Sequence, residues 1–96
     1  MTDNPATTSH LIISGRVQGV GYRHWTVTQA QARNLFGWVR NRQDGSVEAL
    51  LHGAKEAVDD MLSACYKGPA FANVTDIQLA AGEYNGPENF QEKPTV

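Results

Sequence analysis

The sequence predicts a single α+β domain in which strands and helices follow one another in the order β-α-β-β-α-β. Three patterns indicate this fold class. Short runs rich in aliphatic residues end in turn signals, an Asp44-Gly45 pair separates two apolar-bearing runs, and residues 54–65 carry an apolar stripe at helical spacing. A length of 96 residues suits one domain and leaves no room for a second core.

The first half of the chain is expected to contribute three strands and one helix. Residues 10–17 predict a strand because Leu, Ile and Val dominate them and glycine turns follow. Residues 22–34 predict a helix with a poor apolar stripe, ended by Asn34 in a left-handed conformation. An Asp-Gly pair is a strong hairpin signal, so residues 36–43 and 46–53 are expected to pair as antiparallel strands.

The second half is expected to contribute a helix and a strand. The helix buries one face, formed by Ala54, Val58, Met61, Leu62 and Cys65, and Gly68-Pro69 ends it. Residues 73–80 follow as a strand, on which Thr75, Ile77 and Leu79 share a face, and a closing strand around Phe90 is weakly signalled. The complete order is that of the ferredoxin-like sandwich, with two helices on one face of an antiparallel sheet.

Composition excludes several classes of function. The hydrophobic fraction of 41% indicates a globular protein, and a net charge of −2 argues against a nucleic-acid binder with a broad basic face. The single cysteine cannot form an intrachain disulfide, and no apolar segment is long enough to cross a bilayer. Residues 1–9 are polar and lack a signal-peptide pattern, so we expect a flexible leader before one domain at 10–96, in a cytoplasmic monomer.

Two features of the sequence carry potential chemistry. The stretch from Gly15 to Arg23 is a glycine-containing turn that leads into a helix, where backbone N–H groups and the helix dipole favour an anion. Arg23 could add a bidentate grip on phosphate oxygens, although a structural turn with an exposed arginine is an equally good interpretation. Asn41 lies in a predicted strand, where asparagine is depleted, and is either a functional amide or a surface amide.

Taken together, the two segments carry a family resemblance. "GRVQGVGYR" is followed, eighteen positions after Arg23, by the asparagine of "GWVRNRQDGSVE", and both blocks resemble those of the acylphosphatase family in order and spacing. The later "KGPAFANVTDIQ" is similar to the family's Gly-Pro junction and fourth strand. The resemblance covers residues 11–79, and two blocks at a fixed separation are far more specific than either one alone.

The resemblance implies an enzyme that hydrolyses acyl phosphates to a carboxylate and orthophosphate, without metal or organic cofactor. Arg23 would bind the phosphate of this small-molecule substrate, and Asn41 would orient the attacking water. Backbone amides would assist Arg23 along the loop formed by Val17, Gln18, Gly19, Val20, Gly21 and Tyr22. The alternative is a non-catalytic anion-binding or regulatory module of the same fold. A nucleic-acid-reading form is disfavoured because the first and third strands lack stacking aromatics.

The chain departs from the family pattern at two places. Arg33 and Asn34 stand where the family has leucine and glycine, and Phe90 is followed by Gln91 and Glu92 in place of an apolar pattern. Neither change is expected to touch the proposed site. Beside that site, His24 is expected to face away from the phosphate because neighbouring helical residues point about 100° apart. The cysteine Cys65 is expected in the core, and so are Trp25 and Trp38, for which lining a substrate pocket is the alternative.

Overall fold

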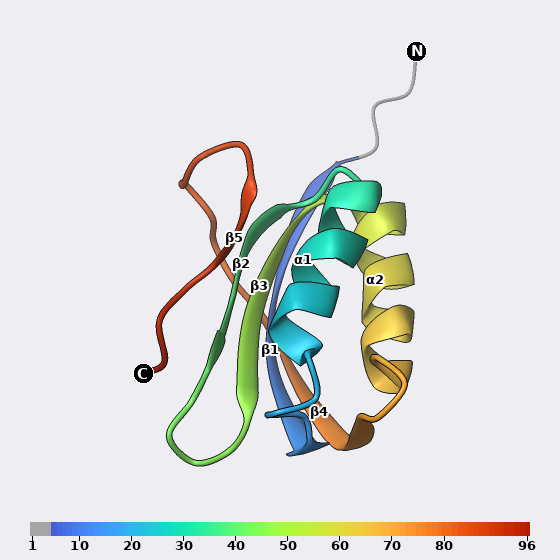
Figure 1. Cartoon of the computed structure of the whole chain (residues 1–96). Helices are drawn as coiled ribbons and strands as arrows, with labels where there is room; N and C mark the ends of the chain where they lie inside the picture. Colours follow the sequence, from blue (N-terminus) through green and yellow to red (C-terminus); the bar gives the residue numbers. More distant parts are fainter. Residues whose placement is uncertain (1–4) are drawn as a thin grey trace.

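The computed structural model describes residues 5–96, and Figure 1 shows two helices packed side by side on one face of a curved sheet. The elements in order are β1 (Ala6–Arg16), α1 (Tyr22–Ala32), β2 (Phe36–Asn41), β3 (Val47–Ala54), α2 (Lys55–Lys67), β4 (Asn73–Ala81) and β5 (Phe90–Glu92). The strands lie in the order β4-β1-β3-β2-β5. This arrangement confirms the predicted α+β ferredoxin-like fold.

The fifth strand makes the sheet mixed. β1, β2, β3 and β4 pair antiparallel as predicted, whereas β5 adds to the free edge of β2 in parallel. A short strand of three residues has too little periodicity to be recognised from sequence, which is why its signal was weak. Within the described residues, neither helix is long and apolar enough to cross a membrane.

β1 begins at Ala6, four residues before the predicted start. Residues 6–9 pair with the end of β3, where Ala6 lies opposite Ala54, so backbone hydrogen bonding and not apolar content extends the strand. The strand therefore starts within the stretch predicted as a flexible leader, and residues 1–4 of that leader lie outside the described residues. The hairpin strands β2 and β3 lie close to their predicted bounds, and Asn34 has the predicted left-handed conformation with φ 58°.

The core lies between the sheet and the two helices. Alternate residues of β1 and β3 face the helices and are fully buried, among them Leu11, Ile13, Val47, Ala49 and Leu51. The predicted apolar face of α2 is buried at Val58, Met61 and Cys65, and Leu62 packs against it while only partly buried. Ala54 differs, because it ends β3 and is exposed.

A bulge changes the predicted pattern of β4. Gly15 of β1 lies opposite Val74 and Ser14 lies opposite Asp76, so Thr75 has no partner in the register. The extra residue reverses the alternation on its N-terminal side, and Val74 packs against the core where Thr75 was expected to share the face of Ile77. Because β4 is an edge strand, Leu79 remains 54% exposed although it shares the face of Ile77.

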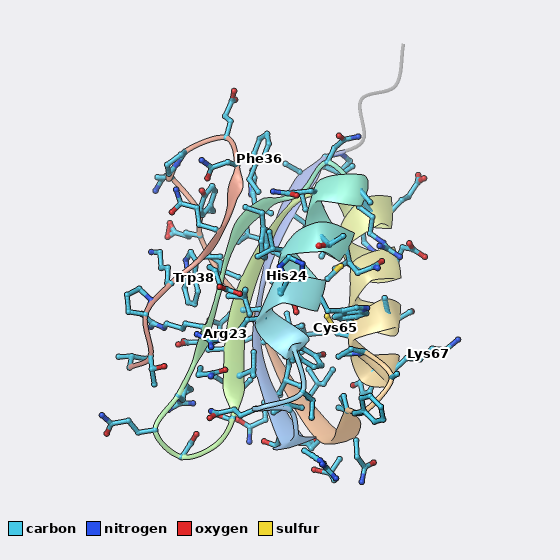
Figure 2. The ribbon with its side chains drawn as sticks, viewed as in Figure 1. Arg23, His24, Phe36, Trp38, Cys65 and Lys67 are labelled. Atoms are coloured by element: carbon cyan, nitrogen blue, oxygen red, sulfur yellow. The ribbon has the colours of Figure 1, made fainter. Side chains whose placement is uncertain are left out.

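Trp38 is not a core residue, contrary to expectation. It lies on the face of the sheet that the helices leave uncovered, as Figure 2 shows, and cations from Arg40 and Lys93 lie 4.6 Å and 5.2 Å from its ring centre. On the same face, Glu48 accepts hydrogen bonds from Arg40 and His10 at 2.7 Å and 2.6 Å. Trp25, by contrast, packs against the core as predicted.

Candidate active site

The loop between β1 and α1 combines open backbone with a helix N-terminus. Gly19 and Gly21 have φ of 75° and 79°, and an added Cβ would meet nothing within 4 Å at either position. Glycine is therefore favoured at both positions because the backbone is left-handed, and not because a neighbour packs closely against it. Gly21 caps α1 without a side-chain hydrogen bond, and the first turn of the helix holds no acidic residue.

The amides of this loop are available to a ligand. Within residues 5–96, the structure records no hydrogen bond from the backbone N–H groups of residues 18–22. Such groups, at the positive end of a helix dipole, form an anion-binding arrangement. The prediction of a phosphate site in this loop depends on these local features.

Gln18 ties this loop to the β2–β3 hairpin. Its side-chain amide donates hydrogen bonds to the carbonyl oxygens of Arg42 and Ser46, each at 2.8 Å. The turn is itself ordered, because Asp44 Oδ1 accepts from the backbone N–H of Ser46 at 2.9 Å and from its hydroxyl at 2.6 Å. These hydrogen bonds lower the pKa of Asp44. Asn41 is the last residue of β2 and directly precedes Arg42. The two hydrogen bonds of Gln18 therefore also position Asn41 relative to the loop.

Loop, helix and strand enclose a cavity of about 160 Å³. Figure 2 shows Arg23 at the start of α1, on the side next to β2. Nine residues line the cavity: Val17, Gln18, Gly19, Gly21, Tyr22, Arg23, His24, Asn41 and Glu92. The structure thus brings Asn41 and Arg23 to one cavity, together with every predicted loop residue except Val20. The side chain of Val20 packs against the core instead.

Two residues of the cavity were not predicted. His24 lines it although it was expected to face away, because the cavity continues along α1 beyond the phosphate-binding loop. Glu92 lines it from β5, the strand with the weakest sequence signal. Sequence reasoning could have found Glu92 only by placing that strand beside β2, since nothing in the local pattern relates it to Arg23.

Tyr22 lines the cavity but is held by the core. Its buried phenol donates a 2.6 Å hydrogen bond to the carbonyl oxygen of Cys65, which fastens the start of α1 to α2. Burial raises the pKa of Tyr22 above its ordinary value, with a further contribution from Cys65. Burial also raises the pKa of the Cys65 thiol to about 12, so both groups stay neutral at pH 7. Among the residues described, no three His, Cys, Asp or Glu side chains gather as metal ligands would.

The chain matches known proteins over nearly its whole length. The acylphosphatase family model matches residues 9–92. An acylphosphatase of Alcanivorax borkumensis is 54% identical over 85 residues, which cover 86% of this chain and 92% of the relative. One of Acidiphilium cryptum is 51% identical over 86 residues, covering 90% of this chain and 94% of the relative.

Solved structures agree with the sequence relatives. The crystal structure of acylphosphatase from Bacillus subtilis is similar with a TM-score of 0.86 and 38% identity, over 90% of this chain and 97% of that one. The stretch that the family model matches, residues 9–92, contains the loop, Arg23 and Asn41. From its sequence blocks, its fold and these matches, the chain belongs to the acylphosphatase family.

Proposed function

We propose that the cavity between the β1–α1 loop, α1 and β2 is the active site in which the chain hydrolyses acyl phosphates to a carboxylate and orthophosphate. Membership of the acylphosphatase family carries the reaction itself. The assignment of roles to residues is supported by one observation: Arg23, Asn41 and a loop whose amides have no recorded hydrogen bond within residues 5–96 all line a single cavity.

Arg23 and the loop amides form the phosphate end of this site. Phosphoryl transfer places most of its demand on positioning and on stabilising charge at the phosphoryl oxygens. The guanidinium of Arg23 is always charged and its fork of donors matches two phosphate oxygens, while N–H groups from residues 18–22 supply preorganised partners. Because the loop is already formed and is held by Gln18, these donors need little rearrangement when substrate binds.

Asn41 aligns the attacking water in this proposal. A carboxamide does not accept a proton near neutral pH, so its role is orientation and not general-base catalysis. The chemistry permits such a simple site because the leaving group is a carboxylate of low basicity, which departs without a general acid. The proton of the water passes to the substrate itself. The raised pKa values of Tyr22 and Cys65 are consistent with this scheme, since neither group is needed as an acid or base.

A non-catalytic anion-binding module is the weaker alternative, because acylphosphatase relatives are about half identical to the chain. We also infer a monomer in the cytoplasm that uses neither nucleic acid nor cofactor. The support for a monomer is that Arg23 and Asn41 line the same cavity within a single copy of the chain, so the proposed site needs no second copy. Sedimentation equilibrium tests the oligomeric state, and a concentration-dependent mass would contradict it.

Hydrolysis of benzoyl phosphate by Arg23→Ala and Asn41→Ala tests the assignment. Each variant is expected to lose at least about 100-fold in kcat/KM, because Arg23→Ala removes a preorganised transition-state donor and Asn41→Ala leaves the attacking water without its orienting group. Arg16→Ala and Asn85→Ala are matched controls that remove the same groups outside the cavity, and both are expected to retain activity. Competitive inhibition by orthophosphate and indifference to a chelator are expected as well. Full activity in both cavity variants would overturn the assignment, and a folded wild type without turnover would favour the binding module.

A further inference from the structure

The phosphate-binding cavity contains one carboxylate, Glu92 of β5. Its position follows from strand pairing, because Glu92 lies opposite Val39 in the parallel β2–β5 register and Phe90 lies opposite Gly37. Phe90 is buried against the core, so the period of two along a strand places Glu92 on the same, helix-covered face of the sheet. The carboxylate therefore comes to the cavity from regular structure and not from a loop.

The backbone that follows Glu92 is hydrogen-bonded to β2. The N–H of Lys93 donates to the carbonyl oxygen of Val39 at 2.8 Å, and the N–H of Val96 donates to that of Asn41 at 3.1 Å. The C-terminal residues thus run along β2 as far as Asn41. The Glu92 side chain is exposed to solvent, and among the ion pairs of residues 5–96 it has no cationic partner within 4.0 Å. Its charge is left facing the cavity without a partner.

The cavity consequently has two ends of different character. Val39, the partner of Glu92, precedes Asn41 by two residues, which places Glu92 about 7 Å along β2 from Asn41 at the rise of a strand. The loop that leads into Arg23 is bonded through Gln18 to Arg42, next to Asn41, whereas Glu92 pairs with Val39, two residues before Asn41. A phosphoryl group binds at the cationic end. The acyl group, which leaves roughly in line with the attacking water that Asn41 holds, extends away from Asn41.

We infer that Glu92 selects acyl phosphates by the charge of their acyl group. It disfavours acyl groups that carry a carboxylate and favours those that carry an ammonium group, and it leaves the phosphate contacts unchanged. This inference rests on the proposed function of the cavity. Like charges separated by roughly 5–10 Å in a partly solvated site repel by an amount that corresponds to roughly a five- to tenfold change in kcat/KM, and salt weakens that repulsion.

Three acyl phosphates of similar size test the inference: propionyl phosphate, which is neutral in its acyl group, succinyl phosphate, which carries a carboxylate, and β-alanyl phosphate, which carries an ammonium group. In Glu92→Gln, the ratio of kcat/KM for succinyl to propionyl phosphate is expected to rise about five- to tenfold. The ratio for β-alanyl to propionyl phosphate is expected to fall several-fold. Both changes are expected to shrink at about 0.5 M salt.

Glu88→Gln is the matched control, since it removes the same charge from an exposed residue outside the cavity. Ratios in Glu92→Gln that stay within twofold of wild type, or that change equally in Glu88→Gln, would overturn the inference. Failure of the proposed function is a separate result, because it appears as full propionyl phosphate turnover in Arg23→Ala. Since Glu92 is exposed, circular dichroism is expected to show an unchanged fold in its glutamine variant.

Discussion

Replacing Gln18 by leucine tests whether the hairpin positions the phosphate-binding loop. The change removes two hydrogen bonds of 2.8 Å, to the carbonyl oxygens of Arg42 and Ser46, and keeps a side chain of similar size. Both carbonyls retain a second donor, because Arg42 N–H bonds to Ser46 O at 2.8 Å and Gly45 N–H to Arg42 O at 3.1 Å. With no acceptor left unsatisfied, the free energy of unfolding is expected to fall by only about 1–2 kcal/mol.

The effect of Gln18→Leu on activity is expected to exceed its effect on folding. In the proposed mechanism the loop amides hold the phosphoryl group and Asn41 holds the water that attacks it, and a displacement of about 1 Å between such groups costs on the order of 100-fold in rate. Phosphate contacts stay intact within the loop, so kcat is expected to fall by about 10- to 100-fold while the inhibition constant of orthophosphate changes by less than about threefold.

Steady-state hydrolysis of benzoyl phosphate and urea unfolding measure the two effects on the same samples. Gln31→Leu, an exposed glutamine of α1, is the matched control and is expected to change neither quantity. Wild-type kcat in Gln18→Leu, together with the expected loss of stability, would show that the clamp stabilises the fold without positioning the site. An unchanged free energy of unfolding would refute the energetic reasoning.

Two further predictions concern the framework. Gly37 has φ of 137°, and in Gly37→Ala the new Cβ would lie 1.9 Å from the carbonyl oxygen of Leu50, so the free energy of unfolding is expected to fall by about 3 kcal/mol or more. Gly45→Ala, where the new Cβ enters open space, is expected to lower it by only about 1–2 kcal/mol. Equal urea midpoints for the two variants would contradict this prediction. Because burial raises the pKa of Cys65 from 9.0 to about 12, and that of Tyr22 as well, the folded state holds these protons more tightly than the unfolded state. Stability is therefore complete below about pH 9 and falls toward pH 12, by up to about 1.4 kcal/mol per pH unit per group. Cys65→Ala is expected to have a shallower fall in alkaline urea titrations, and an unchanged slope would exclude the thiol.

The secondary structure was predictable wherever the chain carries a strong period or a turn signal. The stripe at Val58, Met61 and Cys65, and the Asp44-Gly45 turn, both predicted the elements that the structure contains. The errors have a different origin, in backbone pairing. Residues 6–9 become strand because β3 offers them partners, and the bulge opposite Ser14 and Gly15 exchanges Val74 for Thr75 in the core. Neither the pairing of residues 6–9 nor the bulge can be recognised from the local amino-acid composition.

The sequence predicted the residues of the candidate site that lie in its two blocks, but not the other residues that line the cavity. The spacing of Arg23 and Asn41 gave the family resemblance, and the structure brings both residues to one cavity. His24 and Glu92 were not predicted to line the cavity. For His24 this depends on how far the cavity extends along α1, and for Glu92 it depends on a strand only three residues long. A carboxylate at position 92 had been noted as a departure from the family pattern of the last strand. Its meaning for the site required the β2–β5 register.

Sheet topology explains why the loop needs its clamp. Asn41 would adjoin the loop directly if β2 ran beside β1, but β3 lies between them, and Val47 pairs with Ile13 on one side and with Asn41 on the other. Two strand spacings of about 4.8 Å therefore separate β1 from β2, and the loop must cross the start of β3 to reach Asn41. The side chain of Gln18 spans this gap by hydrogen bonding to the hairpin on either side of its turn. The loop that leads into Arg23 on α1 and the strand that ends at Asn41 are thus tied together by one side-chain amide. This is why the kinetic test of Gln18 bears on the proposed mechanism as directly as tests of Arg23 and Asn41 themselves.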